Sequence, residues 1–306
     1  MSSDIRICQG LSDLSDSYQG WILDQWGVLH YGKAPYPGVL DALQELKSRN
    51  KQIVLLSNSG KRAETNMARM EEIGFDPDVF TAVLTSGEMT YEGLKARDSG
   101  IFQGLGDKCY LFSRQGDTAI VDGCGITLVD QMDQADFIML AGLDHSEKTI
   151  ESYEPELREG VRRGLKMICA NPDMRALMGD QTFLGPGEIA KRYNDFGGVV
   201  HYIGKPHTPI YKAAMERFDG ILPSQMIMVG DSLGHDILGA ARSGIDTCLV
   251  GTGIHAASYK PVKTPEMLQK TLHTLSINYG VRPNFFCPQF EWGKALPDRK
   301  NRRKRT

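Results

Sequence analysis

Two aspartates stand where apolar runs of the sequence end, and a third follows the second of them. Asp24 closes the run GWILD at residues 20–24, and Asp231 closes SQMIMVGD, with Asp236 five residues further on. In an open parallel sheet, ligands bind outside the carboxyl ends of the strands, so Asp24 and Asp231 are expected to converge there. Mg²⁺ prefers oxygen ligands, and two converging carboxylates would suit it. Taken singly, each of these aspartates is typical of a turn or a helix cap.

A serine-rich turn and a lysine follow two further strand ends. The run QIVLLS ends at Ser57, and Asn58, Ser59 and Gly60 then lead into a predicted helix. The N–H groups and the dipole at such a helix start favour an anion. Lys205, just after the run VVHYIG, adds a point charge for the same anion. The joint pattern of strand ends, rather than any single residue, therefore predicts a site for a cation and an anion.

The elements that must hold these residues alternate between strands and helices. GWILD and QIVLLS are short apolar runs that suit buried parallel strands. Between them, YPGVLDALQELKSRN carries apolar residues at helical spacing, and a second helix, KRAETNMARMEEIGF, precedes a third strand, TAVLTS. Strands separated by helices of this length predict right-handed crossovers. The fold class is therefore α/β, with a doubly wound parallel sheet.

A second α/β unit is predicted in the middle of the chain. Its candidate strands are KCYLFS, TAIVDG, DFIMLAGL and LKMICANPD, and SYEPELREGVRRG is a polar helix. VVHYIGKP then resumes the first sheet, followed by the strands SQMIMVGD and TCLVGTG, and PNFFCPQFEW is expected to be an extended strap. The predicted organisation is a core over 1–87, an inserted α/β cap over 88–198, a second core part over 199–286, and a strap with a basic tail over 287–306.

The composition excludes several classes of function. The 306 residues carry a net charge of −3, but the last eight residues, RKNRRKRT, hold six basic residues and no acid. The remaining acidic body argues against a nucleic-acid-binding surface. No apolar stretch is long enough to span a membrane. The start of the chain lacks the pattern of a secretory signal, so we expect a cytoplasmic protein.

The cysteines and the basic tail have simple interpretations. Six cysteines without C-x-x-C spacing are typical of small buried residues in a reducing compartment, and they do not favour a zinc site. The tail is most simply a solvated end. A nuclear targeting signal or a contact with an anionic partner remains an alternative.

Four segments together resemble the motifs of one enzyme family. The four motifs of haloacid dehalogenase (HAD) superfamily hydrolases resemble, in this order, the segments LDQWGVL, LLSNSGKR, YIGKP and VGDSLGHDILGAARSGI. The likeness covers residues 18–255 and is closest to class IIA, whose α/β cap lies between the second and third motifs. In the predicted cap, NPD at 171–173 and GPGEIA at 185–190 resemble segments of sugar-phosphatase-like and nitrophenylphosphatase-like relatives.

The resemblance implies a Mg²⁺-dependent phosphomonoester hydrolase that acts on a small phosphorylated metabolite. Asp24 would be the nucleophile and form an aspartyl phosphate. Ser57 would bind the transferring phosphoryl group, and Lys205 would stabilise its charge. The substrate would contact Asn58, Ser59, Asn171 and Asp173, and the cap loops would select it. Relatives with this cap are often dimeric, so a homodimer is expected.

The same resemblance implies a metal site. Asp24, the backbone carbonyl of Trp26 and Asp231 would hold Mg²⁺, and Asp236 would position these ligands. The family's phosphatases carry an aspartate at the position of Trp26, where it protonates the leaving group and then activates water. An indole N–H cannot exchange a proton near neutral pH. Because general acid–base catalysis contributes typically ~10²–10⁴-fold, the enzyme would be slow or limited to good leaving groups, unless another group replaces the acid.

Two histidines are candidates for that replacement, and two other functions remain as alternatives. His30 is the first candidate proton donor, because it follows the same strand end, and His207 is the second. Trp26 also suits a weak or inactive relative that acts as a binding protein. Dehalogenases of the superfamily carry an aromatic residue at this position, but they need no metal. The retention of Asp231 and Asp236 therefore favours phosphoryl chemistry over carbon–halogen cleavage.

Overall fold

The computed structural model describes residues 4–98, 100–144, 148–178 and 181–293. The basic tail at 299–306 lies outside these residues. The described chain forms two compact units. The first contains residues up to 55, 73–82 and those from 215 onward, and the second contains 56–72 and 83–214. The predicted boundaries of the core and cap remain predictions.

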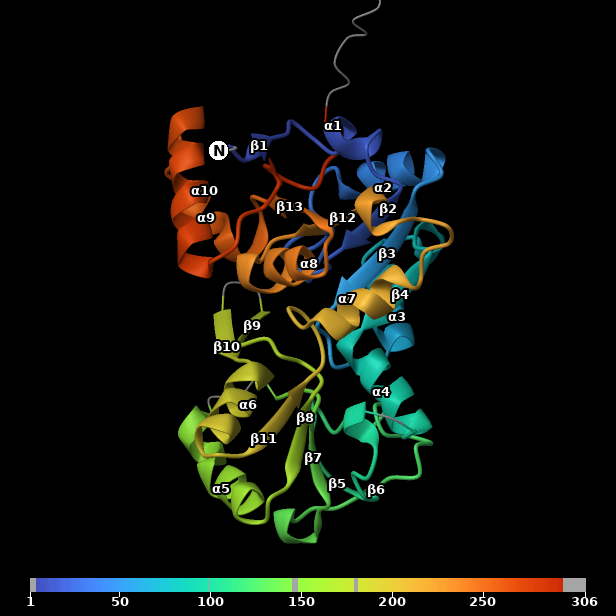
Figure 1. The fold of residues 1–306 in the computed structure, drawn as a ribbon, viewed down its shortest axis with the longest axis vertical. Helices are drawn as coiled ribbons and strands as arrows, with labels where there is room; N and C mark the ends of the chain where they lie inside the picture. Colours follow the sequence, from blue (N-terminus) through green and yellow to red (C-terminus); the bar gives the residue numbers. More distant parts are fainter. Residues whose placement is uncertain (1–3, 99, 145–147, 179–180, 294–306) are drawn as a thin grey trace, which may run out of the picture. The chain divides into compact units, whose positions relative to one another are not determined.

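A seven-stranded sheet with the strand order β1-β14-β13-β12-β2-β3-β4 runs through the fold (Figure 1). Its first six strands pair in parallel, which confirms the predicted doubly wound α/β class. All four residues of β2 are buried, as expected for a parallel strand covered on both faces. The strands are β1 (Arg6–Ile7), β2 (Gly20–Leu23), β3 (Gln52–Ser57), β4 (Ala82–Thr85), β12 (Met226–Gly230), β13 (Asp246–Val250) and β14 (Phe285–Cys287).

The predicted extended strap at 283–292 contains a three-residue strand, Phe285–Cys287, which was not predicted. β14 lies between β13 and β1 and pairs in parallel with both. Pro283 and Pro288 flank this short strand, and prolines argue against a central strand when the sequence is read alone. Here both prolines lie outside the three paired residues. Asn284 joins the neighbouring strand through its side chain, whose Oδ1 accepts bonds of 2.9 Å from both N and Oγ1 of Thr247.

The second unit holds a five-stranded parallel sheet with the order β11-β8-β7-β5-β6 and a separate antiparallel pair, β9 and β10. Alternate residues of β7 face two different apolar clusters. Ile138 and Leu140 pack with residues of α5 (Glu154–Arg162) and α6 (Pro186–Asp195), whereas Phe137 and Met139 pack with Leu94 of α4 (Ser86–Ala96). The strands are β5 (Lys108–Phe112), β6 (Thr127–Leu128), β7 (Phe137–Leu140), β8 (Lys166–Cys169), β9 (Arg175–Met178), β10 (Gln181–Leu184) and β11 (Val199–Tyr202).

Two strand predictions in this unit need correction. The segment TAIVDG at 118–123 forms turns instead of a strand, and its apolar residues Ile120 and Val121 are buried although they lie in a loop. The strand at this edge of the second sheet is β6. The strand within VVHYIGKP exists as β11, but it pairs with β8 in the second sheet instead of resuming the first. A parallel strand is covered on both faces in either sheet, so its apolar pattern does not reveal its partner.

Helices lie within the three segments predicted above to be helical, 36–50, 61–75 and 152–164, and further helices connect other strands. Among the described residues, no helix is long and apolar enough to cross a membrane. The helices are α1 (Ser12–Ser15), α2 (Val39–Ser48), α3 (Ala63–Glu72), α4 (Ser86–Ala96), α5 (Glu154–Arg162), α6 (Pro186–Asp195), α7 (Thr208–Met215), α8 (Leu238–Arg242), α9 (Ala256–Tyr259) and α10 (Pro265–Tyr279).

Candidate active site

The first unit brings three carboxylates together at the ends of β2 and β12. These strands are parallel neighbours, with Leu23 opposite Val229, so Asp24 and Asp231 follow them at the same edge of the sheet. Asp236 comes from the π-helix Leu233–Ile237, directly after β12. One carboxylate oxygen from each aspartate lies within 4.8 Å of the other two, and all three residues are buried. The convergence predicted for Asp24 and Asp231 is therefore present.

Two glycines allow the backbone to approach Asp231 closely. Gly27 and Gly253 have φ angles of +83° and +70°, and a Cβ atom on either would collide with the Asp231 carboxylate. The Ile254 N–H donates a bond of 2.7 Å to Asp231 Oδ2, and the Thr252 hydroxyl donates a bond of 2.5 Å to the Gly27 carbonyl. The contribution of residues 252–254 was not predicted from the sequence. Its one signal was the G-T-G triplet directly after the strand TCLV.

The carboxylate cluster has the chemistry of a site for a hard cation. Three buried acids concentrate negative charge, and buried charge is costly unless it is compensated. All the side-chain donors are oxygen atoms, which suits a divalent cation such as Mg²⁺. Asp236 Oδ2 is oriented by a bond of 3.0 Å from the Ser232 N–H. A Cβ on Gly230 would collide with Asp236, so the glycine at the end of β12 lets this aspartate approach.

Two titratable rings lie close to this cluster. Burial raises the pKa of the Tyr36 hydroxyl, and the negative charge of Asp231 raises it further. Burial lowers the pKa of His255, although the charge of Asp236 opposes this effect. His255 Nε2 accepts a bond of 3.3 Å from the Leu233 N–H, which requires an unprotonated nitrogen. His255 thus fixes the start of the turn that carries Asp236.

Trp26 packs against the turn that follows it. A Cβ on Gly32, whose φ angle is +97°, would collide with the indole ring. The indole also meets the His30 ring edge-on, with 4.9 Å between ring centroids. His30 is buried, and its Nδ1 accepts a bond of 2.9 Å from the Gly32 N–H. When His30 is neutral its proton therefore sits on Nε2, and its role as a proton donor remains a prediction.

The second unit gathers another group of predicted site residues around Asn58. The Asn58 amide nitrogen donates to Asp173 Oδ1 at 2.8 Å and to the Lys205 carbonyl at 3.1 Å. Its amide oxygen accepts a bond of 2.7 Å from the Lys205 N–H. The Lys205 side chain is buried, and its ammonium donates to the Leu56 carbonyl at 3.2 Å. Gly204, with φ +130°, leaves room beside Asn58 and Ser86 that a Cβ would fill.

The remaining predicted residues form local turns in this unit. Ser57 Oγ accepts a bond of 3.3 Å from the Ser59 N–H, and Ser59 Oγ accepts one of 3.3 Å from the Lys61 N–H. Asn171 Oδ1 accepts a bond of 3.1 Å from the Asp173 N–H, which orients the aspartate that Asn58 contacts. Asn58, Asp173 and Lys205 thus form one bonded group, here called the Asn58 group.

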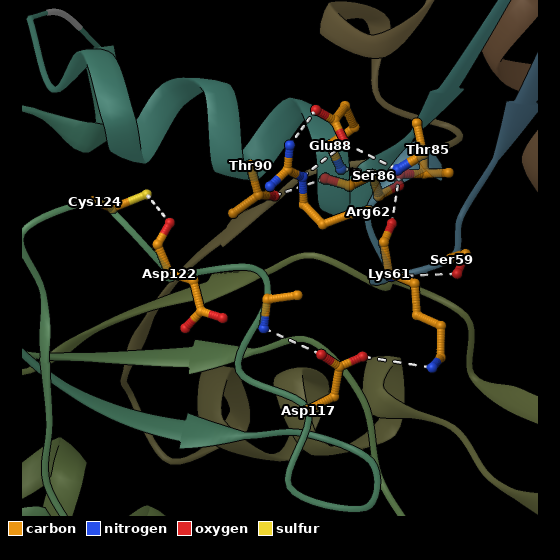
Figure 2. A network of polar contacts seen from close by, with 12 residues as sticks. Ser59, Lys61, Arg62, Thr85, Ser86, Glu88, Thr90, Asp117, Asp122 and Cys124 are labelled. Atoms are coloured by element: carbon orange, nitrogen blue, oxygen red, sulfur yellow. Dashed lines mark hydrogen bonds and ion pairs between the residues drawn. The ribbon is translucent and has the colours of Figure 1, made fainter. Parts of the chain in front are cut away.

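A polar network fixes the loop after Ser57 to helix α4 (Figure 2). Thr85 caps α4 by accepting from the Glu88 N–H at 2.9 Å, and it donates a bond of 2.6 Å to the Lys61 carbonyl. Arg62 holds Glu88 through two bonds, of 2.7 and 2.9 Å, and Glu88 raises the pKa of Arg62. The roles of Arg62, Thr85 and Glu88 were not predicted from the sequence. Their signal was the capping pattern T-S-G-E at 85–88.

Sequence comparison matches both parts of this arrangement to one family. The model for haloacid dehalogenase-like hydrolases matches residues 21–127, and a HAD-hydrolase-like model matches 202–275. These two segments contain Asp24, Ser57, Lys205, Asp231 and Asp236. The chain belongs to the haloacid dehalogenase-like hydrolases.

Named relatives of this HAD hydrolase span most of its length. It is 26% identical to the 5'-nucleotidase YutF of Bacillus subtilis, over 78% of this chain and 89% of that protein. It is also 26% identical to an acid sugar phosphatase of Staphylococcus epidermidis, over 82% of this chain and 92% of the relative. A crystal structure of a haloacid dehalogenase-like hydrolase from Brucella suis superposes with a TM-score of 0.76 and 27% identity, covering 92% and 99% of the two chains.

Proposed function

We propose that this HAD hydrolase is a Mg²⁺-dependent phosphomonoester phosphatase that acts on a small phosphorylated metabolite. The observation that supports this function most is the buried cluster of Asp24, Asp231 and Asp236 at the carboxyl edge of a parallel sheet. Two relatives along most of the chain are named a 5'-nucleotidase and an acid sugar phosphatase. A cluster of oxygen donors suits a metal-assisted reaction better than metal-independent carbon–halogen cleavage.

In the proposed reaction, Asp24 is the nucleophile. A carboxylate oxygen of Asp24 attacks phosphorus, the bond from phosphorus to the leaving oxygen breaks, and an aspartyl phosphate forms. Water then cleaves this intermediate, which releases phosphate and restores the Asp24 carboxylate. Ser57 and Lys205 bind the phosphoryl oxygens and stabilise the charge that develops on them. The substrate also contacts Ser59 and residues of the loop 171–173.

The proposed ligands of Mg²⁺ are Asp24, Asp231 and the backbone carbonyl of Trp26, and Asp236 would position these ligands. When bound, the ion would neutralise charge between the nucleophile and the phosphoryl group. Because Trp26 cannot protonate the leaving oxygen, this oxygen departs with little help from position 26. Aryl phosphates, whose leaving groups are weakly basic, should therefore react faster than alkyl or sugar phosphates.

The test measures phosphate release from an aryl and an alkyl phosphate, with Mg²⁺ and after its removal by a chelator. Turnover should require the metal, and Asp24→Asn should lower it at least about 10³-fold, because an amide is not a nucleophile here. Asp41→Asn, an exposed change on α2, is the matched control and should keep wild-type activity. Full activity of a folded Asp24→Asn protein would disprove the covalent mechanism. Metal-independent release of halide from a haloacid would instead favour a dehalogenase, and absence of any turnover would favour a binding protein.

A further inference from the structure

A small cavity lies at the carboxyl edge of the second sheet. It has a volume of about 30 Å³ and is lined by residues 60–62 after β3, 113–120 after β5 and 141–142 after β7. This is room for roughly two water-sized groups. A Cβ on Gly60 would collide with the Ala141 carbonyl, so two of these loops are in close contact. The cavity therefore has a tightly packed wall and can admit the end of a ligand.

The strand order places this cavity where parallel sheets bind ligands. From β5 the chain passes to β6 at one side of β5, and then to β7 at its other side. The direction of winding therefore reverses between β5 and β7. Ligands of open α/β sheets bind outside the carboxyl ends of the strands at such a reversal. The cavity is lined by the loops after these two strands.

Three basic side chains line the cavity, and they differ in how far nearby carboxylates balance their positive charges. Arg62 is held by two hydrogen bonds to Glu88. The Lys61 ammonium lies 3.4 Å from the carboxylate of Asp117, in a pair that is partly exposed and therefore weakly held. Arg114 is half-buried, and within the described ranges no carboxylate comes within ion-pair distance of its guanidinium.

The groups around Arg114 add to the positive charge of the basic side chains that line the cavity. Burial lowers the pKa of Arg114, and the positive charge of Arg69 on α3 lowers it further, whereas Asp144 acts in the opposite direction. A desolvated guanidinium offers a planar fork of donors that suits a carboxylate or a phosphate. An anion at this point would add to the compensation from Asp144, because Arg114 forms no ion pair with the described carboxylates.

We propose that this cavity binds the anionic head group of a small ligand, a carboxylate or a phosphate, through the Arg114 guanidinium and the Lys61 ammonium. Asp117 holds Lys61 in the absence of the anion. Figure 2 shows the Asp117 carboxylate beside the Lys61 ammonium. The same carboxylate accepts a bond of 3.1 Å from the backbone N–H of Ala119. The small volume limits the site to the head group, so the rest of the ligand lies outside the cavity. This site goes beyond the proposed phosphatase reaction.

The first test maps arginine labelling on the full chain. The protein is treated with butanedione, and modified arginines are identified by mass spectrometry in chloride, inorganic phosphate or succinate at equal ionic strength. The anion should slow modification of Arg114 several-fold and leave Arg162 unaffected, since Arg162 is an exposed residue of α5 outside the cavity. Protection by phosphate alone identifies a phosphate head group, and protection by succinate identifies a carboxylate. An Arg114 that is unprotected by both anions, or closed to the reagent, would overturn the proposal.

The second test measures affinity by calorimetric titration with phosphate and succinate in buffer without Mg²⁺. Arg114→Gln should weaken binding of the protecting anion by roughly tenfold or more, because a charge-assisted pair of bonds is lost. The affinity of Arg114→Lys should lie between those of the wild type and Arg114→Gln, since lysine keeps the positive charge without the planar fork of donors. Arg162→Gln is the control and should match the wild type. Equal affinities in folded Arg114→Gln and wild-type protein would contradict the proposal, whatever the phosphatase assay shows.

Discussion

The carboxylate cluster of the first unit and the Asn58 group of the second unit are built in different ways. Asp231 is enclosed by backbone, through Gly27, Gly253 and an N–H group, and every side chain of its cluster is acidic. The Asn58 group is instead joined by one amide side chain, whose bonds reach the Lys205 backbone and Asp173. Close backbone packing thus concentrates negative charge in the first unit. In the second unit the Asn58 side chain, here called the hub, holds a buried lysine through hydrogen bonds.

This difference predicts what each region contributes. A cluster of like charges is costly to assemble, so its stability should depend on a bound cation. A group whose amide bonds are satisfied internally is already fixed before any ligand arrives, which is how electrostatic catalysis avoids reorganisation. We therefore expect the first region to respond to metal, and the second to be sensitive to the loss of a single side chain.

Among the changes that test this comparison, the largest effect is expected from removing the cation of the second region. Lys205→Met should reduce turnover of an aryl phosphate by about 10²–10³-fold, because a positive charge that stabilises the transferring phosphoryl group is lost. Steady-state kinetics with Mg²⁺ measure this, and thermal unfolding checks the fold. Lys191→Met, on the exposed surface of α6, is the matched control. Unchanged turnover in a folded Lys205→Met protein would remove Lys205 from the catalytic group.

An intermediate effect is expected when the hub itself is removed. Asn58→Ala should lower the free energy of unfolding by about 1–3 kcal/mol, since it leaves the buried Lys205 N–H and the Asp173 carboxylate without their amide partner. Urea unfolding followed by circular dichroism measures the change. Asn171→Ala, which loses a single local bond to the Asp173 N–H, is the comparison and should cost less. Equal losses in the two variants would show that Asn58 is not a hub.

The smallest expected effect concerns Trp26 in the first region. Trp26→Asp supplies a carboxylate at the position of the missing acid, but in a space shaped by an indole against Gly32. We expect the ratio of alkyl to aryl phosphate turnover to rise by up to about tenfold, less than a well-positioned acid provides. Rates on both substrates, with circular dichroism as the folding control, measure it. An unchanged ratio in a folded variant would indicate that another group, His30 first, already transfers the proton.

The sequence predicted those parts of the two regions that depend on local pattern. The ends of β2, β3 and β12 follow directly from apolar runs, so Asp24, Ser57 and Asp231 were placed at strand ends correctly. The position of Lys205 was only partly predictable. β11 was expected in the first sheet and belongs to the second, because pairing with β8 depends on residues about 30 positions away.

The close packing in the first region could not be predicted either. Whether Gly253 touches Asp231 depends on how β13 and β12 lie side by side, which no local pattern encodes. Two other segments were not predicted for the same reason: the three-residue strand β14, which prolines flank, and the buried turns at 118–123. In each case the partner of a residue, rather than its own type, decides its conformation.

The contact between Trp26 and Gly32 has a consequence for how this chain can change. Any side chain at 32 would strike the indole, so a substitution there is blocked while the tryptophan remains. Shortening residue 26 removes the obstacle, and the left-handed φ angle at 32 then still favours glycine or asparagine. A substitution at 32 should therefore destabilise the protein less after residue 26 has been shortened than while the tryptophan is present.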